Sequence, residues 1–392
     1  MDFFEQNIDR RNTASVKWER TKEVFKTEQD VLPMWVADMD FRPPEAVTTA
    51  LQERVEHGIF GYTFIGDNVS KAICSWMRKR HGWTVEKEWI QYSPGVVPSI
   101  GKIIQALTDP GDKILVQSPV YPPFFSMIKS NDRVVENCPL VKSDHQYDID
   151  FNAFEQSLKN GVKLFLLCHP HNPTGRVWKE DELRKMAELC VAHDVVIVSD
   201  EIHSDLILKP HKHIPIASLS DEIGEQTITL VAPSKTFNLA GLQSSAIISS
   251  NNSFRKKITS IDQQQGAFTL NAFGIIAMEA AYLHGEEWLE ELLTYLEGNI
   301  ATVKNYLVEH IPSLSLVEPE ATYLLWIDCR KLGLSDAKIN HLFVEEGKVG
   351  FNPGPSFGKG GEGFVRMNVA CPRATVEEGL KRMKKALKSS NE

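Results

Sequence analysis

Four side chains with chemically useful groups follow short apolar segments that are typical of buried strands. These segments are 113–119, 163–170, 195–200 and 227–235. The residues at or just beyond their ends are Tyr121, Asn172, Asp200 and Lys235. In a parallel sheet covered on both faces, ligands bind in the crevice beyond the carboxyl ends of the strands. We therefore expect these four side chains to line one site.

Lys235 stands in "VAPSKTF", where an apolar run breaks into a loop between two segments that look buried. Most lysines are solvated, and an ordinary loop lysine is one interpretation. The other is a lysine held in a pocket, where it forms an imine with a carbonyl compound. Partial burial lowers the pKa of such an amine and makes it available as a base. The neighbouring motifs decide between the two interpretations.

The other three side chains suit a flat, charged ring. Asp200 follows the apolar run 195–198 and Ser199, so its carboxylate needs a cation or donor, such as a protonated ring nitrogen; a helix cap is the alternative. Asn172, in a turn after a strand, has an amide that can donate to a phenolate-like oxygen, although turns favour asparagine anyway. Tyr121, in "PVYPPF", can lie on the ring or simply pack as an aromatic residue.

The segment 91–107 places a Ser-Pro-Gly turn before an apolar-periodic helix. Free N–H groups at such a helix start form an anion site, although an ordinary capped helix has the same pattern. Gly95 lies at this turn, and the Ser234 hydroxyl beside Lys235 can reach the same phosphate. Together, the motifs meet the requirements of pyridoxal 5′-phosphate, whose ring acts as an electron sink.

The histidines do not indicate a metal site. Two His-x-His pairs, at 169–171 and 211–213, have no carboxylate or cysteine at ligand spacing. His203, three residues after Asp200, is the histidine that we expect to matter for function.

The elements that position these residues alternate between apolar strands and amphipathic stretches such as 179–194, which predicts an α/β domain with a mostly parallel sheet. A long helix from about residue 286 to 310, followed by strand-like 323–329 and 363–371, predicts a smaller α+β domain that packs with the N-terminal arm. We expect residues 50–285 to form the large cofactor-binding domain. Residues 1–49 and 286–392 then form the small one. The "GKGGEG" segment opens a strand rather than a helix, so we interpret it as a turn.

Composition excludes several functional classes. The 392 residues carry 43 lysines and arginines against 52 aspartates and glutamates, without a basic block, so nucleic acid is not expected as a partner. No segment resembles a signal peptide or a membrane span, which favours a cytoplasmic protein. The six cysteines are scattered, with no CxxC pair, and indicate neither a disulfide framework nor a zinc knuckle.

Longer motifs carry a resemblance to known families. "SDEIHSDL", "SKTFNLAGLQ", "HNPTG" and "FVRMN" are similar to the fold-type-I aminotransferase superfamily, which implies a mostly parallel seven-stranded sheet. More narrowly, "LPMWVADMDF", "GIFGYT", "SPGVV" and "GGEGFVRMN" resemble the MalY/PatB-type cystathionine β-lyases, or C–S lyases. The resemblance covers about residues 15 to 373.

The resemblance implies a role for each site residue. Lys235 is the Schiff-base lysine, Asp200 pairs with the pyridine nitrogen, Asn172 binds the ring hydroxyl and Tyr121 stacks on the ring. Phosphate is held by Gly95, Val96 and Ser234, with Tyr62 contributed by the other subunit of a homodimer. The α-carboxylate of the substrate is bound by Arg366; Val36 and Ala37 border the substrate. The superfamily's usual tyrosine and phosphate-binding arginine are replaced here by His203 and Gln243, in agreement with the lyase branch.

The function implied is α,β-elimination from a cysteine S-conjugate, with L-cystathionine as the leading substrate and thiol, pyruvate and ammonia as products. Lys235 removes the Cα proton, and Lys235 or a nearby phenol such as Tyr62 protonates the sulfur; Tyr121 is the other tyrosine that we count as catalytic. An aminotransferase remains an alternative, because the two reactions differ only in later steps. A lyase with an added regulatory protein-binding role is a further alternative.

Overall fold

The computed structural model describes residues 3–143, 146–267 and 269–389. Its largest sheet has seven strands in the order β2-β10-β9-β8-β7-β3-β4. Strand β10 is antiparallel to both neighbours, whereas the other pairs are parallel, so the expected α/β class is confirmed. The strands are β2 (Ile90–Ser93), β3 (Lys113–Val116), β4 (Val134–Asn137), β7 (Val162–Cys168), β8 (Val196–Asp200), β9 (Thr227–Val231) and β10 (Ser245–Ile248).

Helices cover both faces of this sheet. Leu164 and Leu166 of β7 belong to the apolar cluster on one face, and Phe165 and Leu167 belong to the cluster on the other. Successive side chains of a strand point to opposite faces, which explains why these strands read as continuous apolar runs. The first face is covered by α5 (Val96–Leu107), α6 (Pro122–Ser130) and α11 (Asn252–Gln265), and the second by α7 (Phe151–Lys159), α8 (Glu180–Ala192) and α9 (Asp221–Glu225).

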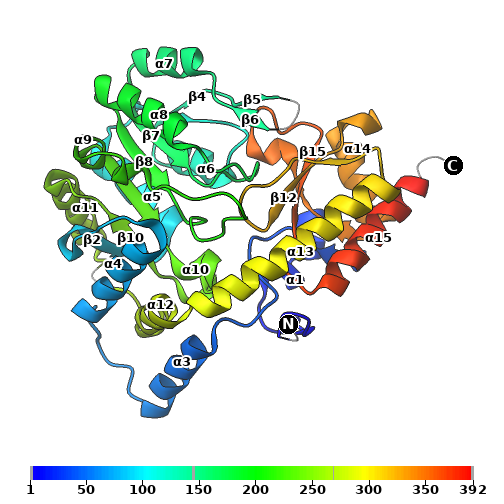
Figure 1. Ribbon diagram of the computed structural model, residues 1–392, viewed down its shortest axis with the longest axis horizontal. Coiled ribbons are helices and arrows are strands. Elements are labelled where there is room, and N and C mark those ends of the chain that lie inside the picture. The colour runs from blue at the N-terminus through cyan, green and yellow to red at the C-terminus, as the bar shows by residue number, and fades with distance from the viewer. Residues whose placement is uncertain (1–2, 144–145, 268, 390–392) are drawn as a thin grey trace.

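A second, antiparallel sheet of four strands has the order β11-β12-β15-β14. The long helix α13 (Glu286–His310), yellow in Figure 1, runs from beside α12 (Ala272–His284) toward the C-terminal helix α15 (Arg373–Ser389). The helix expected over 286–310 is therefore confirmed. The other elements of this part are β11 (Ser315–Leu316), β12 (Leu324–Asp328), α14 (Asp336–His341), β14 (Asn352–Pro353) and β15 (Phe364–Asn368).

The N-terminal segment packs against this second part. Strand β1 (Leu32–Pro33) pairs in parallel with β13 (Val349–Gly350), after the short helices α1 (Val16–Glu19) and α2 (Thr21–Phe25). The backbone N–H of Asn368 in β15 donates to the carbonyl oxygen of Met34, and this bond holds the segment close to β15. The division of the chain at residues 50 and 286 stays a prediction.

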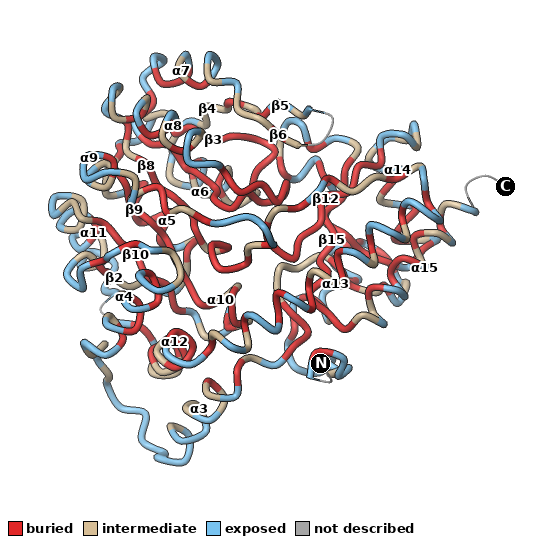
Figure 2. The backbone as a smooth tube through the Cα atoms, in the orientation of Figure 1, coloured by how far each residue is buried: buried red, intermediate tan, exposed pale blue. Residues whose placement is uncertain are grey.

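Two helices flank an exposed segment without regular structure. Residues 58–66 connect α3 (Glu45–His57) to α4 (Asp67–His81). Figure 2 shows this connection as a pale blue loop at the edge of the molecule. A short hairpin of β5 (Val141–Lys142) and β6 (Tyr147–Asp148) completes the fold. Within the described ranges, every helix is too short or too polar to cross a bilayer.

Candidate active site

Three neighbouring strands bring the expected residues together. Cys168, the last residue of β7, pairs with Asp200, the last residue of β8, and Asp200 is also in register with β9. Asn172 and Lys235 each lie four residues beyond the end of their strand. Their side chains line one cavity of about 300 Å³ with Asp200, as expected for the carboxyl edge of a parallel sheet.

Lys235 lies on a one-turn helix, α10 (Pro233–Thr236), and not in the loop that the sequence indicated. Pro233 occupies the first helical turn, where its fixed φ angle favours helix and its missing N–H costs nothing. The Lys235 Nζ donates to the carbonyl oxygen of Ala37 at 2.6 Å. Burial lowers the pKa of Lys235 to about 8, although the charge of Asp38 opposes this shift.

The Asp200 carboxyl group is buried, with 4% of its surface exposed. Burial raises its pKa to about 7, although the N–H of Ile202 and the charge of Lys235 favour the ionised form. The Ile202 N–H reaches Oδ1 at 3.2 Å, and within the described part of the chain no donor reaches Oδ2. A cation placed in the cavity beside Asp200 would therefore stabilise the carboxylate.

Arg366 and Asn172 orient one another across the two sheets. The Arg366 Nη1 donates to Asn172 Oδ1 at 2.9 Å, which leaves the Asn172 amide N–H groups available to the cavity. The Arg366 Nη2 donates to the Trp35 carbonyl oxygen and to Asn352 Oδ1, at 3.0 and 2.7 Å. The Arg366 Nε is buried without a partner among the described residues. Burial lowers the pKa of Arg366 to about 10, so the guanidinium is charged at neutral pH.

The start of α5 faces the same cavity. Gly95 caps this twelve-residue helix, and Gly95 and Val96 line the cavity together with Ser234. The first N–H groups of a helix have no acceptor within it and attract anions. Gln243 also lines the cavity, so this position adds a neutral amide rather than a guanidinium.

Tyr121 and His203 also line the cavity. Burial raises the pKa of the Tyr121 phenol, and the charge of Asp200 raises it further. Burial lowers the pKa of His203 to about 3, helped by the positive charges of Lys235 and Arg366. His203 is therefore neutral, and its buried Nδ1 has no partner in the described structure.

Residues 29–383 match a family model described as "Aminotransferase class I and II". The chain belongs to this family. Cystathionine beta-lyase PatB of Bacillus subtilis is 49% identical to it over 385 residues, which are 98% of this chain and 99% of PatB.

Solved structures of similar proteins extend the comparison. Cystalysin from Treponema denticola, which contains pyridoxal 5′-phosphate, has a TM-score of 0.96 at 35% identity, covering 99% of both chains. The pyridoxal-phosphate-bound C–S lyase from Staphylococcus hominis has a TM-score of 0.91 at 34% identity, covering 98% of this chain and 97% of that one. The resemblance to MalY/PatB-type C–S lyases is therefore confirmed.

Some expected residues of this family member lie outside the cavity. Tyr62 is fully exposed in the segment between α3 and α4. Ala37 lines the cavity, whereas Val36 contributes its carbonyl oxygen to a hydrogen bond with Asn368 Nδ2. Arg366 touches the site through Asn172.

Two residues that the sequence did not single out hold the N-terminal segment at the site. The Tyr323 hydroxyl donates to the carbonyl oxygen of Ala37 at 3.2 Å. Asn238 accepts from the Met39 N–H at 3.0 Å and donates to the carbonyl oxygens of Met39 and Phe41 at 2.9 and 2.8 Å. Asn238 lies in the "SKTFNLAGLQ" motif, which was a signal for it; Tyr323 has no comparable signal.

Three of the four histidines in the two His-x-His pairs are buried and take part in packing, whereas His211 is exposed. The rings of His169 and His213 lie with centroids 4.3 Å apart, and His171 Nδ1 is 2.8 Å from the Thr174 hydroxyl. Among the described residues there is no group of three histidine, cysteine, aspartate or glutamate side chains suited to a metal ion. His169 thus packs behind the site.

Proposed function

We propose that this protein uses pyridoxal 5′-phosphate to eliminate the thiol from L-cystathionine or a related cysteine S-conjugate. Breaking the Cβ–S bond, with consumption of one water, yields homocysteine, pyruvate and ammonia. The observation that carries the proposal is the buried Asp200, whose Oδ2 receives no hydrogen bond from any described residue and which lines one cavity with Asn172 and Lys235. The 49% identity to cystathionine beta-lyase PatB supports the lyase branch.

The cavity residues fit this cofactor. Asp200 would accept from the protonated ring nitrogen, the Asn172 amide would donate to the ring oxygen, and Tyr121 would lie on the ring. The phosphate would be held by Gly95, Val96 and Ser234, together with Tyr62 of a second copy. His203 would lie beside the cofactor ring. When bound, the cofactor supplies an electron sink for the carbanion at the substrate Cα.

The chain's own side chains then supply binding and proton transfer. The Arg366 guanidinium binds the substrate α-carboxylate, and Val36 and Ala37 border the substrate. Lys235 removes the Cα proton, which suits an amine whose pKa is lowered to about 8. Lys235 or a phenol, from Tyr62 or Tyr121, protonates the leaving sulfur.

We further propose that the protein works as a homodimer in the cytoplasm. Ile59, Phe60, Tyr62 and Phe64 expose large apolar surfaces within one short segment, and such patches commonly mark interfaces. A second copy would cover this segment and bring its Tyr62 to the phosphate. Sedimentation and cell fractionation test the two statements.

The decisive experiment incubates the cofactor-loaded protein with L-cystathionine and no keto acid. We expect pyruvate and free thiol to form in equal amounts over many turnovers. Turnover that appears only after a keto acid is added would contradict the elimination and indicate an aminotransferase.

A further inference from the structure

A buried carboxylate lies directly behind the helix that carries Lys235. Asp205, which is 4% exposed, has its two oxygens turned to different elements. Oδ1 accepts hydrogen bonds from Trp76 Nε1 and His81 Nε2 of helix α4, each at 2.9 Å. Oδ2 accepts from the hydroxyl of Thr236, the residue after Lys235, at 2.8 Å. Asp205 therefore links α4 to α10.

We propose that Asp205 is a positioning residue for Lys235, acting through the Thr236 hydroxyl, an inference that rests on the proposed role of Lys235 as the imine-forming lysine. Trp76 and His81 hold Oδ1 of Asp205 in place. Oδ2 of Asp205 then holds Thr236, and with it the helical turn from which the Lys235 side chain extends.

The turn that carries Lys235 needs such an anchor. Helix α10 has four residues, and its backbone bonds run from the N–H groups of Phe237 and Leu239 to the carbonyl oxygens of Pro233 and Ser234. One helical turn is unstable by itself, because few hydrogen bonds repay the ordering of its backbone. A hydrogen bond to an ionised acceptor is roughly twice as strong as a neutral one. The Thr236 side chain, which is 1% exposed, can form this bond without competition from water.

The surroundings of Asp205 keep it ionised. Burial alone would raise its pKa, but hydrogen bonds from His81 and Thr236 and the charge of Arg80 hold the pKa below its usual value. The Tyr282 phenol also lies near this carboxylate, and its pKa is raised by burial and by the charge of Asp205.

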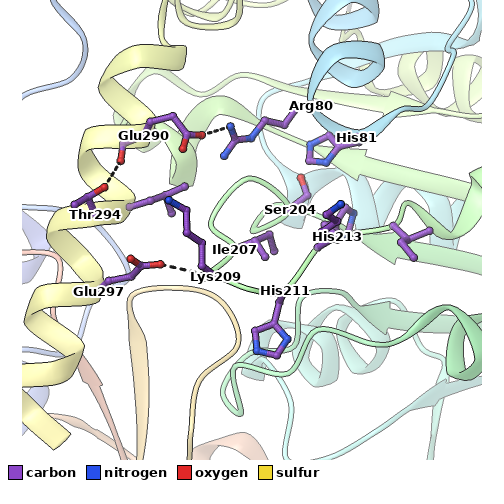
Figure 3. Close-up of a pocket in the computed structure, with 13 residues that line it drawn as sticks. Arg80, His81, Ser204, Ile207, Lys209, His211, His213, Glu290, Thr294 and Glu297 are labelled. Carbon is purple, nitrogen blue, oxygen red and sulfur yellow. Dashed lines mark hydrogen bonds and ion pairs between the residues drawn. The ribbon is translucent and has the colours of Figure 1, made fainter.

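A surface cavity reaches the far side of this link. This cavity has a volume of about 540 Å³. Figure 3 shows His81, Ser204 and His213 on one side of it and α13 on the other. Glu290 of α13 pairs with Arg80, which is next to His81 in α4. Asp205 thus connects the solvent-facing cavity with the helix that carries Lys235. Ser204 lines the same cavity but takes no part in the hydrogen bonds of Asp205 described above, so it is a suitable position for a control substitution.

The test compares capture of the cofactor with simple binding. In Thr236→Val, which keeps the shape of the side chain and removes the hydroxyl, we expect pyridoxal phosphate to react with the cofactor-free protein about tenfold more slowly. Pyridoxamine phosphate, which has no aldehyde for Lys235 to attack, should bind with an affinity within about twofold of the native value. Thr236→Ser should restore the rate, and Ser204→Ala should leave it unchanged.

A double-mutant cycle tests whether the effect passes through Asp205. Thr236→Val combined with Asp205→Asn should slow capture no more than the slower single variant. Multiplied effects, a parallel loss of pyridoxamine phosphate affinity, or an unchanged capture rate in Thr236→Val would each overturn the proposal. A native protein that captures pyridoxal phosphate but releases no pyruvate from L-cystathionine would overturn the proposed function and leave this inference standing.

Discussion

At the scale of single residues, burial moves the pKa values of the Asp200 carboxyl and the Lys235 amine in opposite directions. It raises the pKa of Asp200 to about 7 and lowers that of Lys235 to about 8, because burial disfavours both charged forms. In the cofactor-free site, ionisation of Asp200 is therefore costly. A protonated ring nitrogen beside Asp200 would remove this cost, so cofactor binding should stabilise the fold.

This cost predicts how stability depends on pH. The folded cofactor-free protein holds a proton on Asp200 between the ordinary pKa of 3.8 and about 7, where the unfolded chain releases it. The free energy of unfolding therefore falls as the pH rises through this window. Asp200→Asn removes this contribution. Across this pH range, the free energy of unfolding of the variant should therefore fall by roughly 1 to 4 kcal/mol less than that of the native protein.

Denaturant unfolding at several pH values measures the difference between the two cofactor-free proteins. Contributions from groups that do not interact with Asp200 are common to both and cancel in the comparison, whereas Glu201, whose pKa burial also raises to about 7, interacts with Asp200 and belongs to the measured difference. Parallel stability curves for the two proteins would contradict the assignment of the shift to Asp200.

Lys235 supplies the second prediction at this scale. Lys235→Ala removes both the imine-forming amine and the proposed base, so turnover should fall by roughly 10² to 10⁴-fold or more. The visible absorbance of the cofactor bound covalently to lysine should disappear. Lys212→Ala, which changes an exposed lysine, is the matched control and should keep both properties. A persistent lysine-bound absorbance in Lys235→Ala would contradict the assignment.

At the scale of elements, local pattern predicted most of the architecture. The apolar runs predicted β7, β8 and β9, and with them the convergence of Asn172, Asp200 and Lys235 at one sheet edge. Contacts between distant segments were not predictable in this way. Tyr323 meets Ala37 from 286 positions away, and no local period encodes such a contact. Helix α10 was missed because a single turn is too short to show a period.

The segment around Ala37 is held at the site by Asn238, which predicts an effect on substrate binding. Asn238→Gly removes three hydrogen bonds to Met39 and Phe41. Asn238 has a φ of 58°, in the left-handed region, and glycine adopts this conformation without strain. We expect KM for L-cystathionine to rise about tenfold, consistent with a loss of roughly 1 to 3 kcal/mol.

The affinity for pyridoxal phosphate provides the internal control for Asn238→Gly. Because none of the proposed cofactor contacts lies in the segment 39–41 that Asn238 holds, this affinity should change much less than KM. An unchanged KM would show that the segment keeps its position without Asn238.

At the scale of the whole molecule, the exposed segment 58–66 is the feature that a single chain leaves unexplained. Tyr62 is fully exposed there, and Phe64 has 82% of its surface exposed. Burying an aromatic side chain of this size contributes about 1.5 to 3 kcal/mol, so the exposure is costly unless a partner covers it. A second copy that buries this segment would make each active site depend on both chains.

Hybrid dimers test this dependence directly. A chain carrying Lys235→Ala is paired with a differently tagged chain carrying Tyr62→Phe, and the hybrid is purified through both tags. If Tyr62 serves the partner's site, one site collects both substitutions and the other is intact. The hybrid should then have about half the activity of the native protein, well above either variant alone, because one of its two sites is unchanged. If Tyr62 serves its own chain, the hybrid keeps only half the activity of Tyr62→Phe. Equal activity of Tyr62→Phe and native protein would instead remove Tyr62 from the site.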